Sequence, residues 1–532
     1  MAAKVLNSPR AVQMSLFIVR AFLRMREGLA SGTDILTRMA AIDRKLLVHD
    51  AVLRDVYRKL LPLLSPPPDR PKREIGFQVK PGVSPPLIRV LRQGQAAADS
   101  SLPFPIQPVF GEWSMSASST LNRAVRILGL ITPRDPVDVV LRRELTHRRD
   151  LSPGERRGIV KAIAAYFRWL GWLDAHDSPQ RRVEAALALQ ARFDSNSAAV
   201  KPEALAARAV PEWLAAEMDA IPHDWLRQLQ RDPPLWIRVR QQFADSLPQT
   251  LEDCSAASPP SNLDSRLSTI ALRLPTAFRY TGTQDLFLTE PFQRGQFEIQ
   301  DLASQLVGHA CAPAAGETWW DACAGEGGKT LHLADLMQNK GLIWASDRSL
   351  RRIDVLKKRA ARAEVFNYRT VPWSGGPTPP TRTRFDGVLV DAPCSGVGTW
   401  QRHPHARWTV SPAEVHELAL VQQQLLDHVA GSVKPGGRLI YSVCTLTRAE
   451  TSDTVDAFTR KHPEFKPVAV FPETAGQKAE GRSQAPAVED ALPQKPDLHS
   501  LTSDLSRPTS VLLWPHELNS NGMFIAAWRR QA

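Results

Sequence analysis

The sequence predicts an α/β protein in which a doubly wound parallel sheet follows a helical domain and a small α/β module. Three observations support this order. Apolar residues recur at helical spacing over residues 119–215, short strand-like runs begin near residue 235, and strand-like and helix-like segments alternate from residue 317. Because parallel strands need a crossover connection, usually a helix, regular alternation indicates a doubly wound sheet.

Composition narrows the class of protein. The chain has 532 residues, a length that suggests about three or four domains. Its net charge of +12 favours a polyanionic partner such as nucleic acid, although a basic surface without such a partner is an equal alternative. The five widely spaced cysteines include no CxxC pair, so neither a disulfide framework nor a zinc site is expected. With no secretory signal and no apolar run long enough for a membrane span, we expect a cytoplasmic protein.

The N-terminal part divides into a helical tail at residues 1–79 and a Pro-, Ser- and Gln-rich linker at residues 80–114. Between residues 33 and 61, apolar residues recur at spacings of three and four, which is typical of a coiled-coil seam and predicts self-association. An ordinary amphipathic helix explains the spacing almost as well. Together with RAVQMSLFIVRAFLRMRE before it and LSPPPDRPKR and IGFQV after it, this segment resembles the C-terminal tail of phage-type ORF6N proteins.

A helical domain and a small module are expected next. In residues 115–220, helical spacing appears in AVRILGLI, VDVVLRREL, GIVKAIAAYFRWLGWL and VEAALALQARF, and Ser152 and Glu155 predict a capping box before the third of these. Residues 221–295 are expected to form a small α/β module, with strands at LWIRVR, LSTIALRL and DLFLTE and a polar loop at DCSAASPPSNLDS. The segment GQFEIQDLASQLVGHA is expected to open a helix.

Residues 296–532 are predicted to form the sheet domain. Strands are expected at ETWWDACA, LIWASD, FDGVLVD, RLIYSVC and FIAAWRR, and helices at KTLHLADLMQ, SLRRIDVLKKRAAR, SPAEVHELALVQQQLLDHVA and TRAETSDTVDAFTRKH. Capping boxes at Ser411–Glu414 and Thr447–Glu450 mark the starts of the last two helices. Residues 474–510, rich in Pro, Ser, Gln and Ala, are expected to be a flexible insertion.

A glycine-rich loop, DACAGEGGKT at residues 321–330, follows the first strand of this sheet. Gly325, Gly327 and Gly328 allow the backbone to approach a ligand closely, and the helix that follows offers unpaired N–H groups. The next strand ends at Asp347, where an acid suits ribose hydroxyls. The loop and the acid predict a nucleoside-containing cofactor, without separating NAD from S-adenosylmethionine, and a purely structural turn is the alternative.

Two cysteines are predicted at one edge of the sheet. Cys394 lies in DAPCSGVGTW, directly after the strand that ends at Asp391, and Cys444 lies in SVCTL at the end of a later strand. Ligands of open α/β sheets bind at the carboxyl ends of the strands. A single cysteine is usually a small buried apolar residue, but a pair at a ligand-binding edge indicates thiol chemistry.

DACAGEGGKT, FDGVLVDAPCSGVGTWQRHPHARW and SVCTL together resemble the RsmB/Sun (NOL/NOP-type) family of RNA cytosine-5 methyltransferases. GQFEIQDLASQL resembles the helix that leads into the catalytic domain of this family, and the helical stretch from residue 119 resembles its NusB-like domain. The resemblance implies a Rossmann-like class I methyltransferase domain, an RNA-binding NusB-like domain at residues 115–220, S-adenosylmethionine as the cofactor, and small-subunit (16S) ribosomal RNA as the substrate.

The resemblance also implies roles for the cysteines. The later cysteine of the family is the nucleophile, so Cys444 would attack C6 of cytosine, Cys394 would assist product release, and Asp391 would bind the base or the cofactor. Covalent activation is needed because cytosine is a poor electrophile. The target base must be unstacked, so a single-stranded or flipped-out cytosine is expected.

The same resemblance implies a set of cofactor-binding residues from the glycine loop and two strand ends: Cys323, Ala324, Gly325, Glu326, Gly327, Gly328, Lys329, Asp347 and Asp391. The loop reads Gly-Glu where many relatives have Ala-Pro. The stretch VFNYRTV lacks an acid often found near the adenine, and Asn367 is the candidate to replace it.

RNA contacts are expected from four residues of QRHPHARW: Arg402, His403, Arg407 and Trp408. Lys329, Arg402 and Arg407 are also candidates for lowering the pKa of the nucleophilic thiol. No third ligand accompanies His403 and His405, so no metal site is expected.

Three other functions fit parts of the pattern. A DNA cytosine methyltransferase uses the cysteine of the Pro-Cys loop as its nucleophile, but the second cysteine and the helical domain count against it. A non-catalytic RNA-binding ribosome-assembly factor on the same fold has no need for both cysteines. A dithiol redox pair gives the cofactor loop no purpose.

Overall fold

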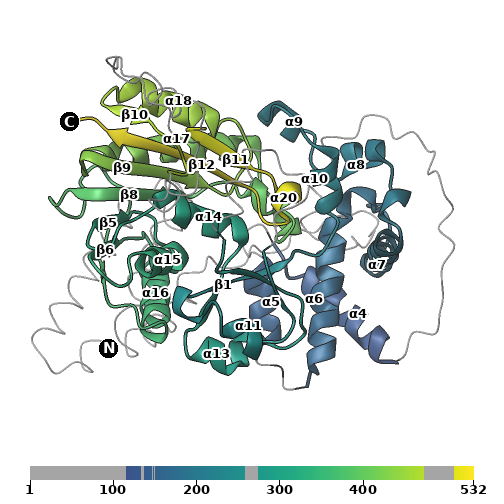
Figure 1. Ribbon diagram of the computed structural model, residues 1–532. Coiled ribbons are helices and arrows are strands. Elements are labelled where there is room, and N and C mark those ends of the chain that lie inside the picture. The colour runs from purple at the N-terminus through teal and green to yellow at the C-terminus, as the bar shows by residue number, and fades with distance from the viewer. Residues whose placement is uncertain (1–114, 133–136, 147, 149, 258–273, 473–507) are drawn as a thin grey trace, which may run out of the picture. The chain divides into compact units, whose positions relative to one another are not determined.

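The computed structural model describes residues 115–132, 137–146, 148, 150–257, 274–472 and 508–532 (Figure 1). The predicted helical tail, the linker and the self-association segment at residues 33–61 lie outside the described residues, as does nearly all of the predicted insertion at residues 474–510. In the part of the chain that is described, no helix combines the length and apolarity that crossing a bilayer requires.

The first described part is helical, as predicted. Its helices are α4 (Met115–Leu128), α5 (Val137–Leu145), α6 (Pro153–Arg168), α7 (Pro179–Ser195), α8 (Pro202–Arg208), α9 (Leu214–Glu217) and α10 (His223–Gln228). The Ser152 side chain accepts the Glu155 N–H, and the Glu155 side chain accepts the Ser152 N–H, which confirms the predicted capping box of α6. The apolar faces of α4, α5 and α6 share one core.

The small module is an antiparallel sheet with the strand order β2-β3-β1-β4. Its strands are β1 (Leu235–Val239), β2 (Cys254–Ala256), β3 (Ala277–Tyr280) and β4 (Phe297–Ile299), accompanied by α11 (Leu247–Thr250) and α13 (Glu290–Gln293). Strand β4 completes this sheet, so the module extends beyond the boundary predicted at residue 295. The helix expected from GQFEIQDL begins only at Leu302, as α14 (Leu302–Cys311), after Asp301 caps it.

Two predictions for the module are wrong. DLFLTE is not a strand but a 3-10 turn, Leu286–Leu288, because the Asp285 side chain accepts the Phe287 N–H and Thr289 caps α13. The expected polar loop contains β2, whose backbone pairs with β3. The predicted strand LSTIALRL lies outside the described residues except for Leu274.

The third part is the predicted doubly wound sheet. Its strands, in the order β10-β12-β9-β8-β5-β6-β7 with β11 on β12, are β5 (Thr318–Asp321), β6 (Leu342–Ala345), β7 (Tyr368–Thr370), β8 (Phe385–Asp391), β9 (Val433–Val443), β10 (Phe465–Pro467), β11 (Ser510–Leu513) and β12 (Met523–Arg530). Strands β5 to β9 pair in parallel, whereas β12 is antiparallel to β9, β10 and β11. Its helices include α15 (Gly328–Leu336), α16 (Leu350–Arg362), α17 (Pro412–Ala430), α18 (Ser452–Lys461) and α20 (Pro515–Leu518).

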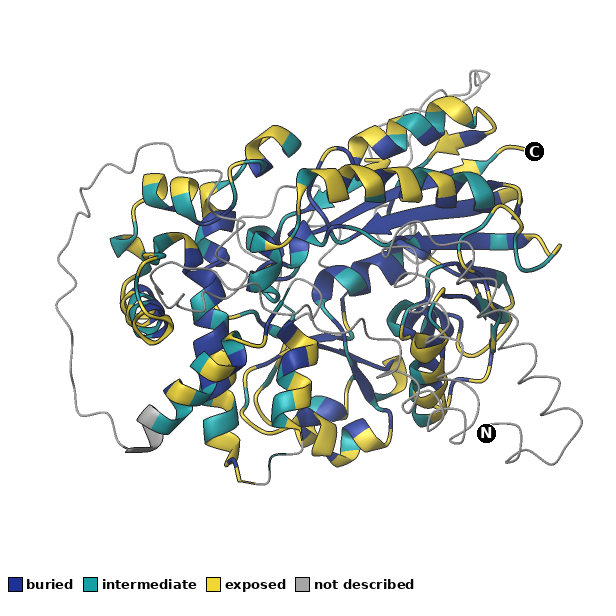
Figure 2. Cartoon of the chain, turned by 180° about the vertical axis from the view of Figure 1, so that it is seen from behind, coloured by how far each residue is buried: buried dark blue, intermediate teal, exposed yellow. Residues whose placement is uncertain are grey.

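The central strands are covered on both faces, and Figure 2 shows them in the dark blue of buried residues. One face packs with α14 and α15 around Trp319, and the other packs with α17 around Trp320. This double burial explains the nearly continuous apolar run of β8. The chain winds from β5 toward β6 and β7 on one side and continues through β8 and β9 on the other. The carboxyl ends of β5 and β8 therefore flank the point where strand order reverses, which is where ligands of open α/β sheets bind.

Candidate active site

Four strand ends bring chemically active side chains to one edge of the sheet, and three of these residues, Asp347, Asp391 and Cys444, were predicted from the sequence. Strands β5 and β8 end at Asp321 and Asp391, Asp347 follows β6, and Cys444 follows β9. The register of β8 and β9 places Asp391 opposite Ser442, two residues before Cys444. Because these strands are parallel, their carboxyl ends converge.

The two cysteines are in direct contact. The Sγ atoms of Cys394 and Cys444 lie 3.2 Å apart, both side chains are partly buried, and neither is in a disulfide. The hydrogen bond to Cys444, together with burial and the nearby carboxylate of Glu450, raises the pKa of the Cys394 thiol well above its ordinary value. Cys394 therefore keeps its proton near neutral pH.

Glycines hold the Cys394 loop against the sheet. Gly396 has a φ of +73°, in the left-handed region that favours glycine. The Gly398 N–H donates to the Cys444 carbonyl at 3.1 Å, and a Cβ on Gly398 would lie 2.4 Å from the Gly522 oxygen. A side chain at residue 398 would force the loop away and separate the two thiols.

A lysine and a carboxylate flank the thiols. Lys329 Nζ donates to Asp391 Oδ2 at 2.8 Å, and Ser442 Oγ donates to Asp391 Oδ1 at 2.8 Å. Burial disfavours the Lys329 ammonium, but the Asp391 carboxylate and the proximity of Cys444 outweigh it and raise the lysine pKa. Lys329 is thus a fixed positive charge at this edge of the sheet, and its effect on the nucleophilic thiol stays a prediction.

A buried carboxylate, Glu450, joins the two cysteine loops, and the sequence reasoning missed it. Ser395 follows Cys394, and its N–H donates to Glu450 Oε1 at 2.9 Å while its hydroxyl donates to Oε2. Thr445 follows Cys444, and its hydroxyl donates to Oε2 at 3.0 Å. Glu450 is completely buried and thereby links the residue after each cysteine.

Further donors complete this network. The Thr447 hydroxyl and the Gln422 amide each donate to Glu450 at 2.9 Å, and the same amide donates to the Pro393 carbonyl at 2.9 Å. The predicted capping box Thr447–Glu450 is wrong as a helix start, because α18 begins at Ser452 after Thr451. The signal available in the sequence was the clustering of hydroxyl residues around one acid, close to both cysteine motifs.

The glycine loop fits a nucleoside ligand. Gly325 has a φ of +54°, and a Cβ on it would meet nothing within 4 Å, so the loop is open there. Gly327 has a φ of +86°, and a Cβ on it would lie 2.6 Å from the Leu356 side chain. Asp347 accepts the Gly325 N–H at 3.0 Å and the Ser349 N–H at 2.7 Å. Each carboxylate oxygen keeps a lone pair for a ribose hydroxyl.

The remaining loop residues differ in exposure. Glu326 is exposed and its carbonyl accepts from Arg359, Gly328 begins α15, and Ala324 is buried against α16. Burial raises the pKa of the Cys323 thiol, which is partly buried and packs against the core cluster around Trp320. Asp321, beneath the loop and not singled out from the sequence, accepts from the Thr330 hydroxyl, and burial raises its pKa to about 7.

Asn367 does not replace the missing acid near the adenine. It precedes β7 and therefore lies at the amino end of that strand, away from the ligand edge. Its Nδ2 donates to the Lys340 carbonyl at 3.3 Å. Asn367 therefore does not compensate for the acid that VFNYRTV lacks.

QRHPHARW contacts the helical part rather than lying open for RNA. Arg407 is completely buried, and its guanidinium donates to the carbonyls of Ala209, Leu229 and Trp400. Trp408 Nε1 donates to the Phe167 carbonyl at 2.7 Å, and its ring packs against the helical core. The positions of Arg407 and Trp408 count against the RNA contacts that were expected of them. The burial of Arg407 also counts against its expected effect on the pKa of the nucleophilic thiol.

Arg402 and His403 are less enclosed. Arg402 Nη2 donates to the Pro234 carbonyl at 3.0 Å and lies 3.6 Å from Asp301, with 31% of its side chain exposed. Burial lowers the pKa of His403, whose ring meets that of His405 edge to face. In the described part of the chain, no three His, Cys, Asp or Glu side chains are grouped to hold a metal ion.

We expect Arg407→Ala to lower the free energy of unfolding by about 2–3 kcal/mol, because it leaves three carbonyls without a donor and opens a cavity. Urea unfolding followed by tryptophan fluorescence measures this change, and Arg231→Ala, at an exposed arginine, is the control. A variant of unchanged stability that bound RNA more weakly would instead support the expected RNA contact.

Comparisons with known proteins give a family match for the sheet domain. Residues 309–529 match the family model described as 16S rRNA methyltransferase RsmB/F. The chain is 32% identical over 328 residues to probable ribosomal RNA small subunit methyltransferase B of Bacillus subtilis, covering 60% of this chain and 66% of the relative. It is 36% identical over 205 residues to the protein of the same name from Synechocystis sp., covering 38% of this chain and 46% of the relative. The chain thus spans about half to two thirds of the length of these relatives.

One solved structure supports the fold. The crystal structure of PH0851 has a TM-score of 0.57 and 22% sequence identity, covering 77% of this chain and 98% of that chain. At this identity the likeness concerns the fold alone. The matched 77% of this chain is longer than the sheet domain, so the likeness in fold extends beyond the doubly wound sheet.

Proposed function

The methyltransferase domain of this chain, residues 309–529, belongs to the RsmB/F family, and from that premise we propose that the protein is a ribosomal RNA methyltransferase. Its reaction is the transfer of a methyl group from S-adenosylmethionine to C5 of a cytosine in small-subunit ribosomal RNA. The observation that carries the C5 chemistry is the contact of the two thiols, 3.2 Å apart, beside the Lys329–Asp391 ion pair.

The geometry supports different roles for the two thiols. Cys444 is close enough to the Lys329 ammonium to affect its pKa, whereas the hydrogen bond to Cys444, burial and the Glu450 carboxylate disfavour a negative charge on Cys394. Cys444 is therefore the nucleophile that forms a bond to C6 of cytosine, which makes C5 nucleophilic. After C5 has received the methyl group, a base takes the C5 proton, the C5–H electron pair restores the C5–C6 double bond, and the C6–S bond breaks with the Cys444 thiolate as the leaving group. Cys394, in contact with Cys444, would assist this release.

Asp391 binds the edge of the base. One of its oxygens holds Lys329 and the other accepts from Ser442, so its orientation is fixed from both sides. With 29% of its side chain exposed, it can still receive a hydrogen bond from the cytosine amino group. Such a fixed acceptor positions C6 over Cys444 without reorganisation in the reaction.

The methyl donor is held by the glycine loop. The open space at Gly325 lets a ligand approach the backbone closely, and Asp347 accepts hydrogen bonds from the ribose hydroxyls. S-adenosylmethionine, when bound there, supplies the methyl group to the adjacent cysteine site. The loop sequence Gly325–Lys329 thus links donor binding to catalysis, because Lys329 lies at its end.

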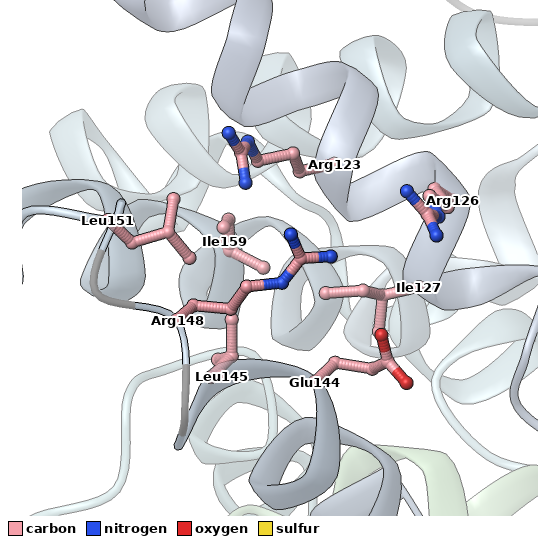
Figure 3. Close-up of a pocket in the computed structure, with 8 residues that line it drawn as sticks. All are labelled: Arg123, Arg126, Ile127, Glu144, Leu145, Arg148, Leu151 and Ile159. Carbon is pink, nitrogen blue, oxygen red and sulfur yellow. The ribbon is translucent and has the colours of Figure 1, made fainter.

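The helical part supplies a second surface for RNA. A pocket of about 220 Å³ among α4, α5 and α6 has an apolar lining that includes Ile127 and Ile159. It also carries three guanidinium groups and one carboxylate, from Arg123, Arg126, Arg148 and Glu144 (Figure 3). Arg123 pairs with Asp150 at 3.0 Å. Guanidinium groups around apolar surface suit a phosphate with its neighbouring base.

The proposal is tested by incubating the full chain with unmodified 16S ribosomal RNA and methyl-labelled S-adenosylmethionine. We expect label in 5-methylcytosine after nuclease digestion, at one position when the RNA is mapped by bisulfite sequencing. Double-stranded DNA is the matched alternative substrate. Label in DNA alone would support a DNA methyltransferase, and tight RNA binding without label would support an assembly factor.

A further inference from the structure

The helix α16 carries a strongly basic outer face beside the methyl-donor site. Its first residue, Leu350, comes three residues after Asp347, the acid that accepts the Gly325 N–H of the glycine loop. Five exposed cations, Arg348, Arg351, Arg352, Lys357 and Lys358, make up what we call the α16 basic surface. Arg348 directly follows Asp347, whose carboxylate accepts the Gly325 N–H at 3.0 Å, so this end of the surface lies next to the glycine loop.

Two further arginines of α16 form ion pairs inside the fold, unlike most cations of the α16 basic surface. Arg359 and Arg362 turn inward and pair with the buried carboxylate of Glu298 in the small module. Of the five cations of the α16 basic surface, Lys357 pairs with Asp354 at 3.4 Å. The other four form no ion pair with any acid in the described ranges.

Helix stability does not explain this charge pattern. The first turn of α16 contains no acid, and Arg351 and Arg352 occupy it. Cations near the positive end of a helix dipole are unfavourable. A solvated helix face usually mixes both signs of charge. The start of α16 thus departs from the usual preference for acidic residues in the first turn of a helix. Departures of this kind are expected at functional sites, and this one lies at the ligand edge of the sheet.

The methyl donor does not use these arginines. An arginine beside the ribose-binding acid of a dinucleotide fold receives the 2′-phosphate of the cofactor. S-adenosylmethionine contains no phosphate, so the positive charge beside Asp347 has no anionic partner at the adenosine end of the donor. The phosphate-bearing ligand of the proposed reaction is the RNA.

We infer that the α16 basic surface binds the phosphodiester backbone of the substrate RNA next to the target cytosine. This inference rests on the proposed function. Arg351 and Lys358 are about 10 Å apart along the helix at 1.5 Å per residue, enough to follow a strand over more than one phosphate. Contacts of this kind set register and affinity without reading sequence.

The test compares two double variants that remove the same charge. Arg351→Gln/Arg352→Gln alters the α16 basic surface. Arg382→Gln/Arg384→Gln alters two exposed arginines before β8, at the opposite edge of the sheet. Filter binding to 16S RNA across salt concentrations gives the slope of log K against log salt, and steady-state methylation gives kcat and KM.

We expect the α16 double variant to reduce the magnitude of the salt slope by about 1.5, from two lost phosphate contacts at about 0.7–0.9 each. Its KM for RNA should rise about tenfold at moderate salt, while its kcat and its Kd for S-adenosylmethionine stay at wild-type values. The control double variant should change none of these quantities. An equal effect of both double variants, or an effect of neither, would overturn the inference.

The two failures can be told apart. If the wild-type chain binds 16S RNA but transfers no methyl group, the proposed function is wrong. The salt slopes of the two double variants still show whether the RNA contacts the α16 basic surface. An active wild-type chain with an unchanged slope in the α16 double variant removes the inference alone.

Discussion

Cys444→Ala is expected to abolish methyl transfer, with a fall in kcat of roughly 10³-fold or more, because no other group can form the bond to C6. We expect the Cys394 thiol, 3.2 Å away, not to substitute, since its burial and the Glu450 carboxylate still disfavour a thiolate there when Cys444 is absent. The variant should still bind RNA and S-adenosylmethionine with wild-type affinity, because neither the glycine loop nor α16 is altered. Labelled methyl transfer to 16S RNA measures the loss.

Cys394→Ala is the matched partner of this variant. It keeps the nucleophile but removes the assistance to product release, so we expect a covalent RNA–protein adduct that survives a denaturing gel. The double variant should form no adduct. An adduct in Cys444→Ala and none in Cys394→Ala would reverse the two roles and favour the DNA-type mechanism, in which the Pro-Cys cysteine attacks.

The sheet domain was predictable because its signals are local. A buried parallel strand requires a continuous apolar run, and FDGVLVD satisfies that requirement on its own. The small module shows the converse. Strand β2 consists of three residues, one half-buried and two exposed, and becomes a strand only through pairing with β3, which lies more than twenty residues away. Similarly, the apolar residues of DLFLTE fit a strand. The Asp285 and Thr289 side chains instead cap a 3-10 turn and α13, so the segment does not extend into a strand.

The candidate site divides in the same way. Both cysteines could be placed at one sheet edge, since motif and strand end coincide in the sequence. The carboxylate that links their two loops, Glu450, could not be placed in this way, because its partners Ser395 and Gln422 come from segments far apart in the chain. QRHPHARW illustrates the limit of composition, because arginine and tryptophan serve equally in RNA binding and in packing between elements. Only the burial of Arg407 and the Trp408 bond to Phe167 separate these purposes.

Glu450→Gln is expected to lower kcat by roughly 10²-fold while leaving the Kd for S-adenosylmethionine unchanged. The carboxylate accepts from Ser395, Thr445, Thr447 and Gln422, whereas an amide replaces one acceptor oxygen with a donor that faces these donors. The loops after the two cysteines would then separate, and a displacement of about 1 Å in a reacting group is enough for a loss of this size. Glu450 would thus act as a positioning residue, since it touches neither the base nor the donor.

A purely structural role must be separated from positioning. Glu417→Gln, at an exposed glutamate on α17, is the control, and the melting temperature of both variants is measured beside kcat and KM. Alkylation of Cys394 across pH adds a readout that packing alone would not move. Removal of the Glu450 charge should shift the alkylation midpoint to lower pH, because that charge helps to raise the Cys394 pKa. A Glu450→Gln variant that melts earlier but keeps wild-type kcat and the same alkylation midpoint would show that the carboxylate only packs the loops.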